Sequence, residues 1–216
     1  DAIILAAGQG TRMKSNKAKV LHQLGGKSLL QHVVDAINPL SDSINIVIGN
    51  DGELVKNSIS SHSINWVVQK KQLGTGHAVQ QAKTSINDKS TCIILYGDVP
   101  LISTNTIKLL ITQSQLTGFA LLSVILDDPS GYGRIVRDKS ELIQAIIEHK
   151  DADDDKQKIN EINTGIMAIK GSLLKKYLSQ LEPDNKQGEL YLTDIVENAV
   201  SDNVTISSLV CDNVSE

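Results

Sequence analysis

The sequence predicts an α/β fold in which helices flank a mixed, mostly parallel β-sheet. Short apolar runs, typical of buried strands, alternate with segments whose apolar residues recur at helical spacing. The 216 residues are 40% apolar and 21% charged, a composition typical of folded globular proteins. Because no internal repeat or low-complexity linker divides the chain, we expect one domain over residues 1–216, with lobes at about 1–117 and 118–216 that share a sheet.

The first half of the chain alternates regularly between predicted strands and helices. Residues 2–6 (AIILA) are apolar at every position, as expected of a strand covered on both faces. Residues 29–37 (LLQHVVDAI) have apolar positions three and four apart, which predicts a helix, and we expect a loop over 7–26. The same patterns predict strands over 44–48, 66–68 and 91–96, and helices after Gly52, over 75–86 and over about 104–115.

Beyond Phe119 the predicted strands follow one another with little helix between them. Strands joined by short connections pair antiparallel, so we expect the second half to bring antiparallel strands into the sheet. Phe119 itself, like Trp66, is expected in the core. The predicted strands here are 119–126, 135–137, 142–147, 162–169 and 204–210, and the predicted helices are 172–181 and 192–199.

Charge and composition exclude several function classes. The formal net charge of −4 and the 3% aromatic content disfavour a nucleic-acid surface, which needs excess cations and stacking rings. The longest charge-free apolar stretch, 118–126, is half of a bilayer span, and the N-terminus lacks the basic flank of a signal peptide, so we expect no membrane association. Two cysteines, Cys92 and Cys211, give no disulfide framework and fit a reducing cytoplasm.

Glycines and cations follow the first predicted strand. Gly8 and Gly10 leave backbone N–H groups uncovered, so the turn can wrap phosphate oxygens, and Arg12 adds a fixed cation. Met13 replaces the third glycine of a dinucleotide fingerprint, and no Gly-Lys-Ser/Thr closes a Walker loop. With no Asp or Glu between residues 2 and 34, the segment predicts a small anionic ligand, although a plain glycine turn shows the same Gly-x-Gly spacing.

Seven motifs resemble those of sugar-phosphate nucleotidyltransferases and, more narrowly, the N-terminal domain of the bacterial bifunctional N-acetylglucosamine-1-phosphate uridylyltransferase/glucosamine-1-phosphate acetyltransferases, the GlmU family. The resemblance implies a Rossmann-like nucleotidyltransferase fold with a sugar-binding lobe. It implies transfer of a uridylyl group from UTP to N-acetylglucosamine 1-phosphate, giving pyrophosphate and UDP-N-acetylglucosamine for peptidoglycan and lipopolysaccharide synthesis. The motifs are LAAGQGTRM at 5–13, KVLH at 19–22, QKKQLGTGH at 69–77, LYGDVPL at 95–101, GYGRI at 131–135, EHKD at 148–151 and EINTG at 161–165.

The implied reaction joins two anions, and its nucleophile, a phosphate oxygen, is already ionised. Such a reaction needs positioning and charge neutralisation rather than a general base. The resemblance assigns catalysis to Arg12 and Lys19. The family has Pro where this chain has Ala18, and the register of the motif selects Lys19 over Lys17. The residues implied in nucleotide binding are Leu5, Ala6, Ala7, Gly8, Gly10, Thr11, Gln69, Gly74 and Thr75.

Uracil presents an acceptor, a donor and an acceptor along its pairing edge, which a side-chain amide and backbone groups complement. The resemblance gives this role to Gln69 and Gly74, with Thr75 beside them. The residue types alone leave alternatives open: an exposed Gln69 at a strand end, and Thr75 as the N-cap of the next helix. Gln72 supplies a second amide in the same loop, so only the resemblance selects Gln69.

Asp98 follows an apolar strand and a glycine, which places a carboxylate at a strand end beside the expected phosphates. Mg²⁺ binds one or two carboxylate or amide oxygens, and phosphates and water complete its octahedron. The residue types fit equally an Asp that caps a turn before Pro100. The resemblance makes Asp98 a Mg²⁺ ligand and places a second ligand, an Asn, beyond Glu216.

Sugar hydroxyls and an N-acetyl group are recognised by carboxylates, amides and small apolar surfaces. On residue type alone, Glu148 is a solvated surface residue. Residues 151–158 (DADDDKQK) lack the glycine and the twelfth-position Glu of a Ca²⁺ loop, so we expect a solvated charged surface there. The sugar-binding residues that the resemblance implies are Tyr96, Gly97, Gly133, Glu148, Asn163, Tyr191 and Thr193.

Other function classes stay open on the sequence. One alternative is a nucleotidyltransferase for a different sugar 1-phosphate; another is a truncated nucleotide-sugar binding module with impaired turnover, because the chain ends before the expected second metal ligand. Met13 and the lack of an acidic residue after 44–48 disfavour an NAD-dependent oxidoreductase. The resemblance implies that the family's C-terminal β-helix acetyltransferase domain, which carries the homotrimer contacts of full-length members, is absent here, and we expect no acetyl transfer.

Overall fold

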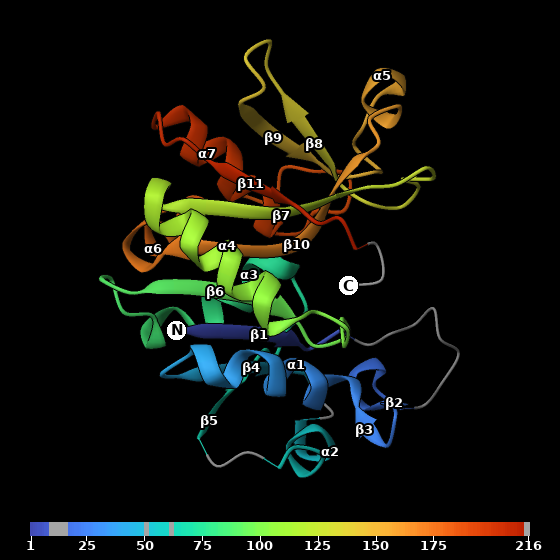
Figure 1. The fold of residues 1–216 in the computed structure, drawn as a ribbon, viewed down its shortest axis with the longest axis vertical. Helices are drawn as coiled ribbons and strands as arrows, with labels where there is room; N and C mark the ends of the chain where they lie inside the picture. The colour runs from blue at the N-terminus through green and yellow to red at the C-terminus, as the bar shows by residue number, and fades with distance from the viewer. Residues whose placement is uncertain (9–16, 50–51, 61–62, 214–216) are drawn as a thin grey trace.

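The computed structural model describes residues 1–8, 17–49, 52–60 and 63–213. Within them, nine strands form one mixed sheet (Figure 1). The first strand, β1 (Ala2–Ala6), is parallel to its neighbours on both sides, whereas β10 (Glu161–Lys170) runs antiparallel to both of its long neighbours. The order across the sheet is β11 (Ser207–Val210), β7 (Phe119–Ile125), β10 (Glu161–Lys170), β6 (Thr91–Tyr96), β1 (Ala2–Ala6), β4 (Ile44–Ile48) and β5 (Ile64–Val68), and β8 (Arg134–Arg137) joins β10 to β9 (Ile143–Ile147).

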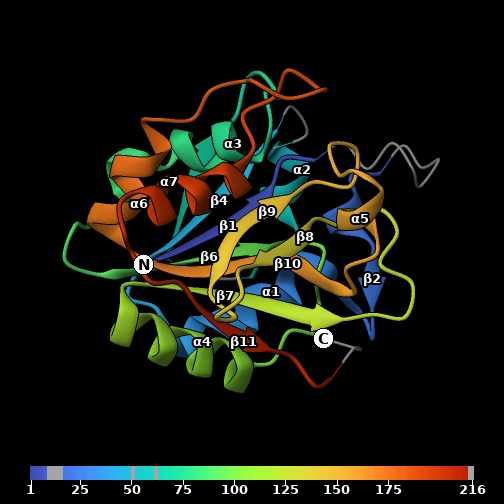
Figure 2. The same ribbon diagram turned by 90° about the horizontal axis from the view of Figure 1, so that it is seen from above.

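Helices cover both faces of this sheet (Figure 2). β1 shows why its sequence is apolar throughout: Ile3 and Leu5 pack into one buried cluster, and Ile4 packs into the other, because successive side chains point to opposite faces. The cluster with Ile4 holds residues of α1 (Leu29–Ile37), α2 (Gly52–Asn57) and α4 (Thr104–Thr117), and the cluster with Ile3 holds residues of α3 (Thr75–Gln81), α6 (Gly171–Leu178) and α7 (Ile195–Ser201).

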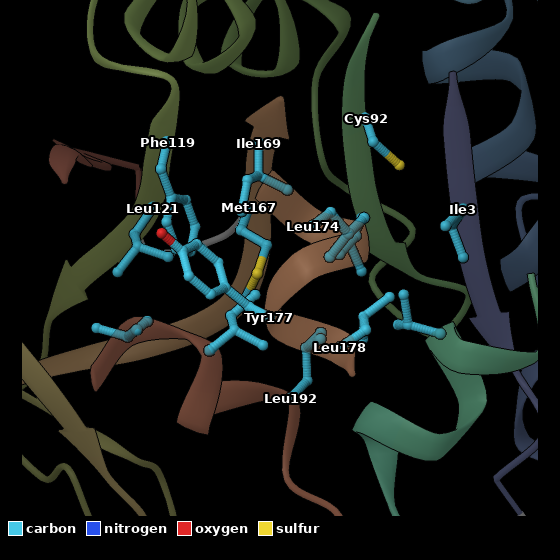
Figure 3. Close-up of a cluster of buried hydrophobic side chains, with 14 of the residues drawn as sticks. Ile3, Cys92, Phe119, Leu121, Met167, Ile169, Leu174, Tyr177, Leu178 and Leu192 are labelled. Atoms are coloured by element: carbon cyan, nitrogen blue, oxygen red, sulfur yellow. The ribbon is translucent and has the colours of Figure 1, made fainter. Parts of the chain in front are cut away.

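The larger cluster joins the two halves of the chain. In Figure 3, Phe119 of β7 and Met167 of β10 gather with Tyr177 of α6, and all three are 0% exposed. Ile3 of β1 belongs to the same cluster. Phe119 therefore lies in the core as expected, whereas Trp66 is partly buried and packs against the opposite cluster. Across the described residues, every helix is too short or too polar to cross a lipid bilayer.

Strands 2–6, 44–48 and 91–96 and helix 29–37 have the bounds that their apolar patterns predict. The α/β class, the mostly parallel order and the mixed, partly antiparallel second half are confirmed, since β10, β8 and β9 pair antiparallel while β11 runs parallel to β7. Several other bounds differ by a few residues, since the sheet and helix ends follow tertiary contacts. Smaller elements complete the chain: β2 (Gln23–Leu24), β3 (Lys27–Ser28), α5 (Asp154–Gln157), and the 3₁₀ turns η2 (Lys19–Leu21), η3 (Asn38–Leu40), η4 (Lys83–Ser85) and η5 (Leu192–Asp194).

Two predictions are corrected by these elements, and a third is extended. The helix expected over 75–86 ends at Gln81, and 83–85 tighten into a 3₁₀ turn. The loop expected over 7–26 contains η2 and the first strand of the small β2–β3 hairpin. In the charged segment 151–158, Asp153 accepts a hydrogen bond from the Lys156 N–H at 2.9 Å and starts α5, a helix cap that charge counting overlooks.

Candidate active site

The carboxyl ends of β1 and β6 meet at one edge of the sheet, on the right in Figure 1. Leu5 is paired with Tyr96 in parallel register, and the Gly97 N–H donates to the Leu5 carbonyl at 2.9 Å. The start of the predicted phosphate loop, residues 5–8, therefore lies beside the turn that carries Asp98. Ligands of open α/β sheets bind beyond such strand ends. Of the predicted loop residues, Gly10, Thr11 and Arg12 lie outside the described part of the chain.

A lysine and an aspartate pair at this edge. Lys19 Nζ lies 2.5 Å from Asp98 Oδ2, and the two side chains are 43% and 26% exposed, so both remain open to a ligand. Lys19 is held in place because Val20 and Leu21, which follow it in η2, are buried in the core. Ala18 adopts a φ of −53°, within the range of proline, so the backbone needs no Pro to take this conformation.

Gln69 is buried, with 4% exposed, which contradicts the alternative of an exposed strand-end residue. Its Nε2 donates to the Gly74 carbonyl at 3.2 Å and lies 3.0 Å from Nδ1 of His77. Gln72 has a different partner: its Nε2 donates to the Ala7 carbonyl at 2.6 Å and so ties the loop after β5 to the loop after β1. His77 is a neighbour of Gln69 that the sequence did not predict, although it lies in the QKKQLGTGH motif.

The turn at Gly74 packs against a distant segment of the chain. Its φ is +108°, and an added Cβ would lie 2.4 Å from the Leu190 carbonyl oxygen, so only glycine fits. The Leu190 N–H donates to the Leu73 carbonyl at 2.8 Å. Thr75 is not the N-cap of α3, which is Gly74. Instead, Thr75 Oγ1 accepts from the Leu192 N–H at 3.1 Å, because its hydroxyl faces this distant segment.

A second cluster gathers polar groups from the residue before β8, the residue after β9, β10 and η5. Thr193 Oγ1 donates to Glu148 Oε1 at 3.1 Å, and a Cβ on Gly133 would lie 3.4 Å from the same oxygen. The Asn163 N–H donates to the Gly133 carbonyl at 2.8 Å, and Asn163 Oδ1 accepts from the Gly165 N–H at 3.1 Å. The structure thus brings together four residues predicted to bind a sugar and keeps Glu148 partly buried rather than solvated.

Burial shifts the acidity of this cluster. It raises the pKa of Glu148, an effect that the Thr193 hydrogen bond opposes and the Asp151 charge reinforces. Burial also raises the pKa of Asp194 to about 6, with further contributions from Glu197, Glu148 and Asp151. A group of carboxylates close enough to influence one another favours a ligand rich in hydrogen-bond donors, such as a polyol.

Tyr96 connects the two ends of the site. Burial raises the pKa of its phenol, the Glu148 and Asp98 charges add to the effect, and a hydrogen bond with Thr75 opposes it. An added Cβ on Gly165 would lie 2.4 Å from Cε2 of the Tyr96 ring. Tyr96 therefore lies between Asp98 on one side and the cluster around Glu148 on the other.

Tyr191, a further predicted sugar-binding residue, is buried, with 7% exposed, and its hydroxyl accepts a hydrogen bond from Gln187 Nε2.

In the part of the chain that the structure describes, no three or more His, Cys, Asp or Glu side chains gather as a metal site. Asp98 is nevertheless a carboxylate at the carboxyl end of β6, where it pairs with Lys19. A Mg²⁺ ion held largely by substrate phosphates needs only one or two protein oxygens. The donor set therefore fits a phosphate-borne magnesium ion and not a preformed metal cage.

Comparison with solved structures places this fold among nucleotidyltransferases. A UDP-glucose pyrophosphorylase complexed with UDP-glucose superposes with a TM-score of 0.76 at 19% identity, covering 96% of this chain and 89% of the other. A putative glucose-1-phosphate thymidylyltransferase from Bacillus anthracis, in complex with a sucrose, gives a TM-score of 0.74 at 21% identity, with 98% and 87% covered. At these identities the likeness concerns the fold alone, and it confirms the predicted Rossmann-like class.

Curated relatives confirm the resemblance that the motifs carry. The bifunctional protein GlmU of Ruthia magnifica subsp. Calyptogena magnifica is 52% identical over 215 residues, and that of Vesicomyosocius okutanii subsp. Calyptogena okutanii is 54% identical. Each match covers 100% of this chain but 47% and 48% of the relative, so the chain spans about half the length of the curated relatives it matches. Since the model of one domain family also matches residues 2–158, the chain belongs to the MobA-like NTP transferase domain family.

Proposed function

We propose that this chain transfers a uridylyl group from UTP to N-acetylglucosamine 1-phosphate, releasing pyrophosphate and giving UDP-N-acetylglucosamine. The observation that carries the proposal is the Lys19–Asp98 pair, 2.5 Å apart at the edge where the loop after β1 begins. A cation and a carboxylate at this position suit a reaction that brings two phosphates together. The GlmU relatives, identical at more than half of the aligned positions, support the choice of these two substrates.

Each group of residues in the proposed site has its own role. Gln69 and Gly74 recognise the base, and Thr75 supports the turn at Gly74. The residues that line the phosphate-binding loop are Leu5, Ala6, Ala7, Gly8, Gly10, Thr11 and Arg12. Lys19 and Arg12 offset phosphate charge, so an already ionised phosphate oxygen attacks the α-phosphorus without a general base. The proposed sugar-binding side chains and backbones are Tyr96, Gly97, Gly133, Glu148, Asn163, Tyr191 and Thr193.

Asp98 is the residue that would hold Mg²⁺, together with substrate phosphates and a second protein ligand expected beyond Glu216. When bound, the ion neutralises phosphate charge. With Asp98 holding the ion, Lys19 would contact a substrate phosphate oxygen rather than the carboxylate with which it pairs here. The proposal includes the assignment of residues 1–117 to the nucleotide and 118–216 to the sugar, a reducing cytoplasm as the location, and a homotrimer for full-length members.

A coupled pyrophosphate assay with UTP, N-acetylglucosamine 1-phosphate and Mg²⁺ tests the proposal. Lys19→Met and Asp98→Asn should each lower kcat by about a hundredfold, because phosphate charge is no longer offset in the transition state. Lys27→Met is the matched control, since Lys27 pairs with Asp35 at 2.6 Å on an exposed surface elsewhere. Lys19→Met and Asp98→Asn should each leave the thermal unfolding midpoint nearly unchanged, because exposed ion pairs contribute about 0–1 kcal/mol to stability.

Normal turnover and an unchanged Mg²⁺ titration in Asp98→Asn would remove the pair from the mechanism. A panel of nucleoside triphosphates against several sugar 1-phosphates separates the other candidates. Faster turnover of another pair would assign a different nucleotidyltransferase activity. Tight binding of UDP-N-acetylglucosamine without pyrophosphate release, measured by calorimetry, would assign a binding module.

A further inference from the structure

The ring of His77 lies between two glutamine amides. Its Nδ1 is 3.0 Å from Nε2 of Gln69, and its Nε2 is 3.1 Å from Nε2 of Gln81. A neutral imidazole has one acceptor nitrogen and one N–H donor. It can therefore accept a hydrogen bond from only one of the two amides, and the position of the ring proton decides which one.

The surroundings of Gln69 decide this competition. Its Nε2 also lies 3.2 Å from the Gly74 carbonyl oxygen, which can only accept, so the NH₂ end of the amide must face that side. The second N–H of the same group then points to His77 Nδ1. Gln69 is 4% exposed, so water cannot replace a lost partner. Gln81 Nε2 also donates to the His77 carbonyl at 3.2 Å, but Gln81 is partly exposed at the end of α3, so its amide can turn and exchange these partners for water.

We propose that His77 is a positioning residue that locks the Gln69 carboxamide in one orientation and thereby sets the preference for uracil over cytosine. The inference rests on the proposed function, because it assumes that Gln69 faces the base. His77 accepts through Nδ1 and carries its proton on Nε2. It touches Gln69 and not the nucleotide.

With the amide in this orientation, Gln69 offers its Oε1 acceptor to the ligand, next to the Gly74 N–H. Gln69 Oε1 accepts no hydrogen bond from any residue that the structure describes, and the Gly74 N–H likewise donates to none of them. An acceptor beside a donor matches the N3–H and O4 of uracil. Cytosine carries an acceptor at N3 and a donor at N4, the reverse at both positions. Turning the Gln69 amide over would exchange its acceptor for a donor and remove this discrimination.

The ring proton can be located without any substrate. Long-range ¹H–¹⁵N spectra of histidine-labelled chain at pH 8, with the His77 signals assigned by their loss in His77→Asn, should show the Nε2–H tautomer. A proton on Nδ1 would overturn the proposal, because Nδ1 could not then accept from Gln69. This measurement decides the role of His77 even if the chain proves inactive.

Two substitutions at His77 test the roles of its two ring nitrogens separately. Asn places an acceptor near the position of Nδ1, whereas Gln reaches the position of Nε2 and leaves Gln69 without a partner. The ratio of kcat/KM for UTP to that for CTP should be kept in His77→Asn and fall about tenfold in His77→Gln. Gln81→Met, which removes the other amide, should keep the ratio. Equal ratios in the Asn and Gln variants would overturn the proposal.

Failure of the proposed function has a separate signature. If the unmodified chain releases no pyrophosphate from any pair of substrates, uridylyl transfer is wrong, and the affinities for UDP and CDP, measured by calorimetry on the same variants, replace the kinetic ratio. A tenfold loss of UDP preference in His77→Gln alone would still support the positioning role. Unchanged preference in that variant would reject it.

Discussion

At the scale of single residues, the carboxylates around η5 show how burial and neighbouring like charges lower stability. Asp194 begins α7, where an Asp commonly caps the helix, yet its side chain accepts no capping hydrogen bond. Burial and the nearby charges of Glu197, Glu148 and Asp151 raise its pKa to about 6. The folded chain therefore holds this proton more tightly than the unfolded chain does. Ionising Asp194 therefore costs the folded chain free energy.

Asp194→Asn should therefore stabilise the ligand-free chain, and only at higher pH. With a folded pKa of about 6 against 3.8 unfolded, the unmodified protein loses stability as pH rises from about 4 to 6. The variant lacks this loss, so its gain should grow over that interval and level off near about 1–2 kcal/mol, reduced by solvent screening. Urea unfolding of both proteins at pH 4 and pH 8 measures the difference.

Asp128→Asn is the matched control with the opposite sign. Hydrogen bonds from Ser130 lower the pKa of Asp128, so ionisation of that carboxyl stabilises the fold and its removal should cost stability as pH rises. If Asp194→Asn gained nothing at pH 8, or gained equally at pH 4, burial and the neighbouring carboxylates would not raise the pKa of Asp194.

The positions of predicted site residues followed from the sequence where a motif adjoins the end of a predicted strand, whereas the roles of these residues stay predictions. Lys19 and Asp98, from separate motifs, lie together as a phosphate site requires. The partners of Gln69 were not predictable, because the contact with His77 depends on how the loop after β5 folds onto α3. In the same loop, Gln72 donates a hydrogen bond to the Ala7 carbonyl, which lies far away in the chain. Side-chain orientation of this kind follows from tertiary packing, which no local pattern encodes.

At the scale of elements, β10 combines pairing and a bend. Its register with β7 shifts between Asn163 and Met167, and Gly165 lies in that bulge with a φ of +82°. The bulge turns Asn163 toward Gly133 while Met167 and its successors stay in the core. Apolar runs predicted the strands well, but this bend depends on one glycine. Its reason, the Tyr96 ring packed against Gly165, lies on another strand.

Gly165→Ala should destabilise the chain far more than Gly131→Ala. Both glycines have positive φ, +82° and +85°, which costs an alanine about 1 kcal/mol. At Gly165 the new Cβ would also lie 2.4 Å from the Tyr96 ring, whereas at Gly131 nothing lies within 4 Å. We expect a loss of about 3 kcal/mol at Gly165 and about 1 kcal/mol at Gly131 in urea unfolding. Similar losses at both positions would mean that Tyr96 moves aside freely.

At the scale of the whole molecule, β10 makes one sheet out of two differently built halves. It is hydrogen bonded to β6 of the first half on one side and to β7 of the second half on the other. The larger core cluster crosses the same boundary, with Ile3 and Ile94 packed among residues such as Phe119 and Tyr177. A lobe that unfolded alone would strip β10 of one set of partners and expose this shared core. The two lobes should therefore unfold together.

Two fluorescent reporters at opposite edges of the sheet can test this cooperativity. Trp66, the single tryptophan, lies on β5 at one edge, and Val210, 40% exposed on β11, lies at the other. The two proteins to compare are the unmodified chain and a Val210→Trp variant that also carries Trp66→Phe. In urea, the tryptophan fluorescence transition of each protein should coincide with its own far-UV circular dichroism transition. If the β11 reporter changed first, the second lobe would be an independent folding unit, and the sugar cluster would form on a separately folding part of the chain.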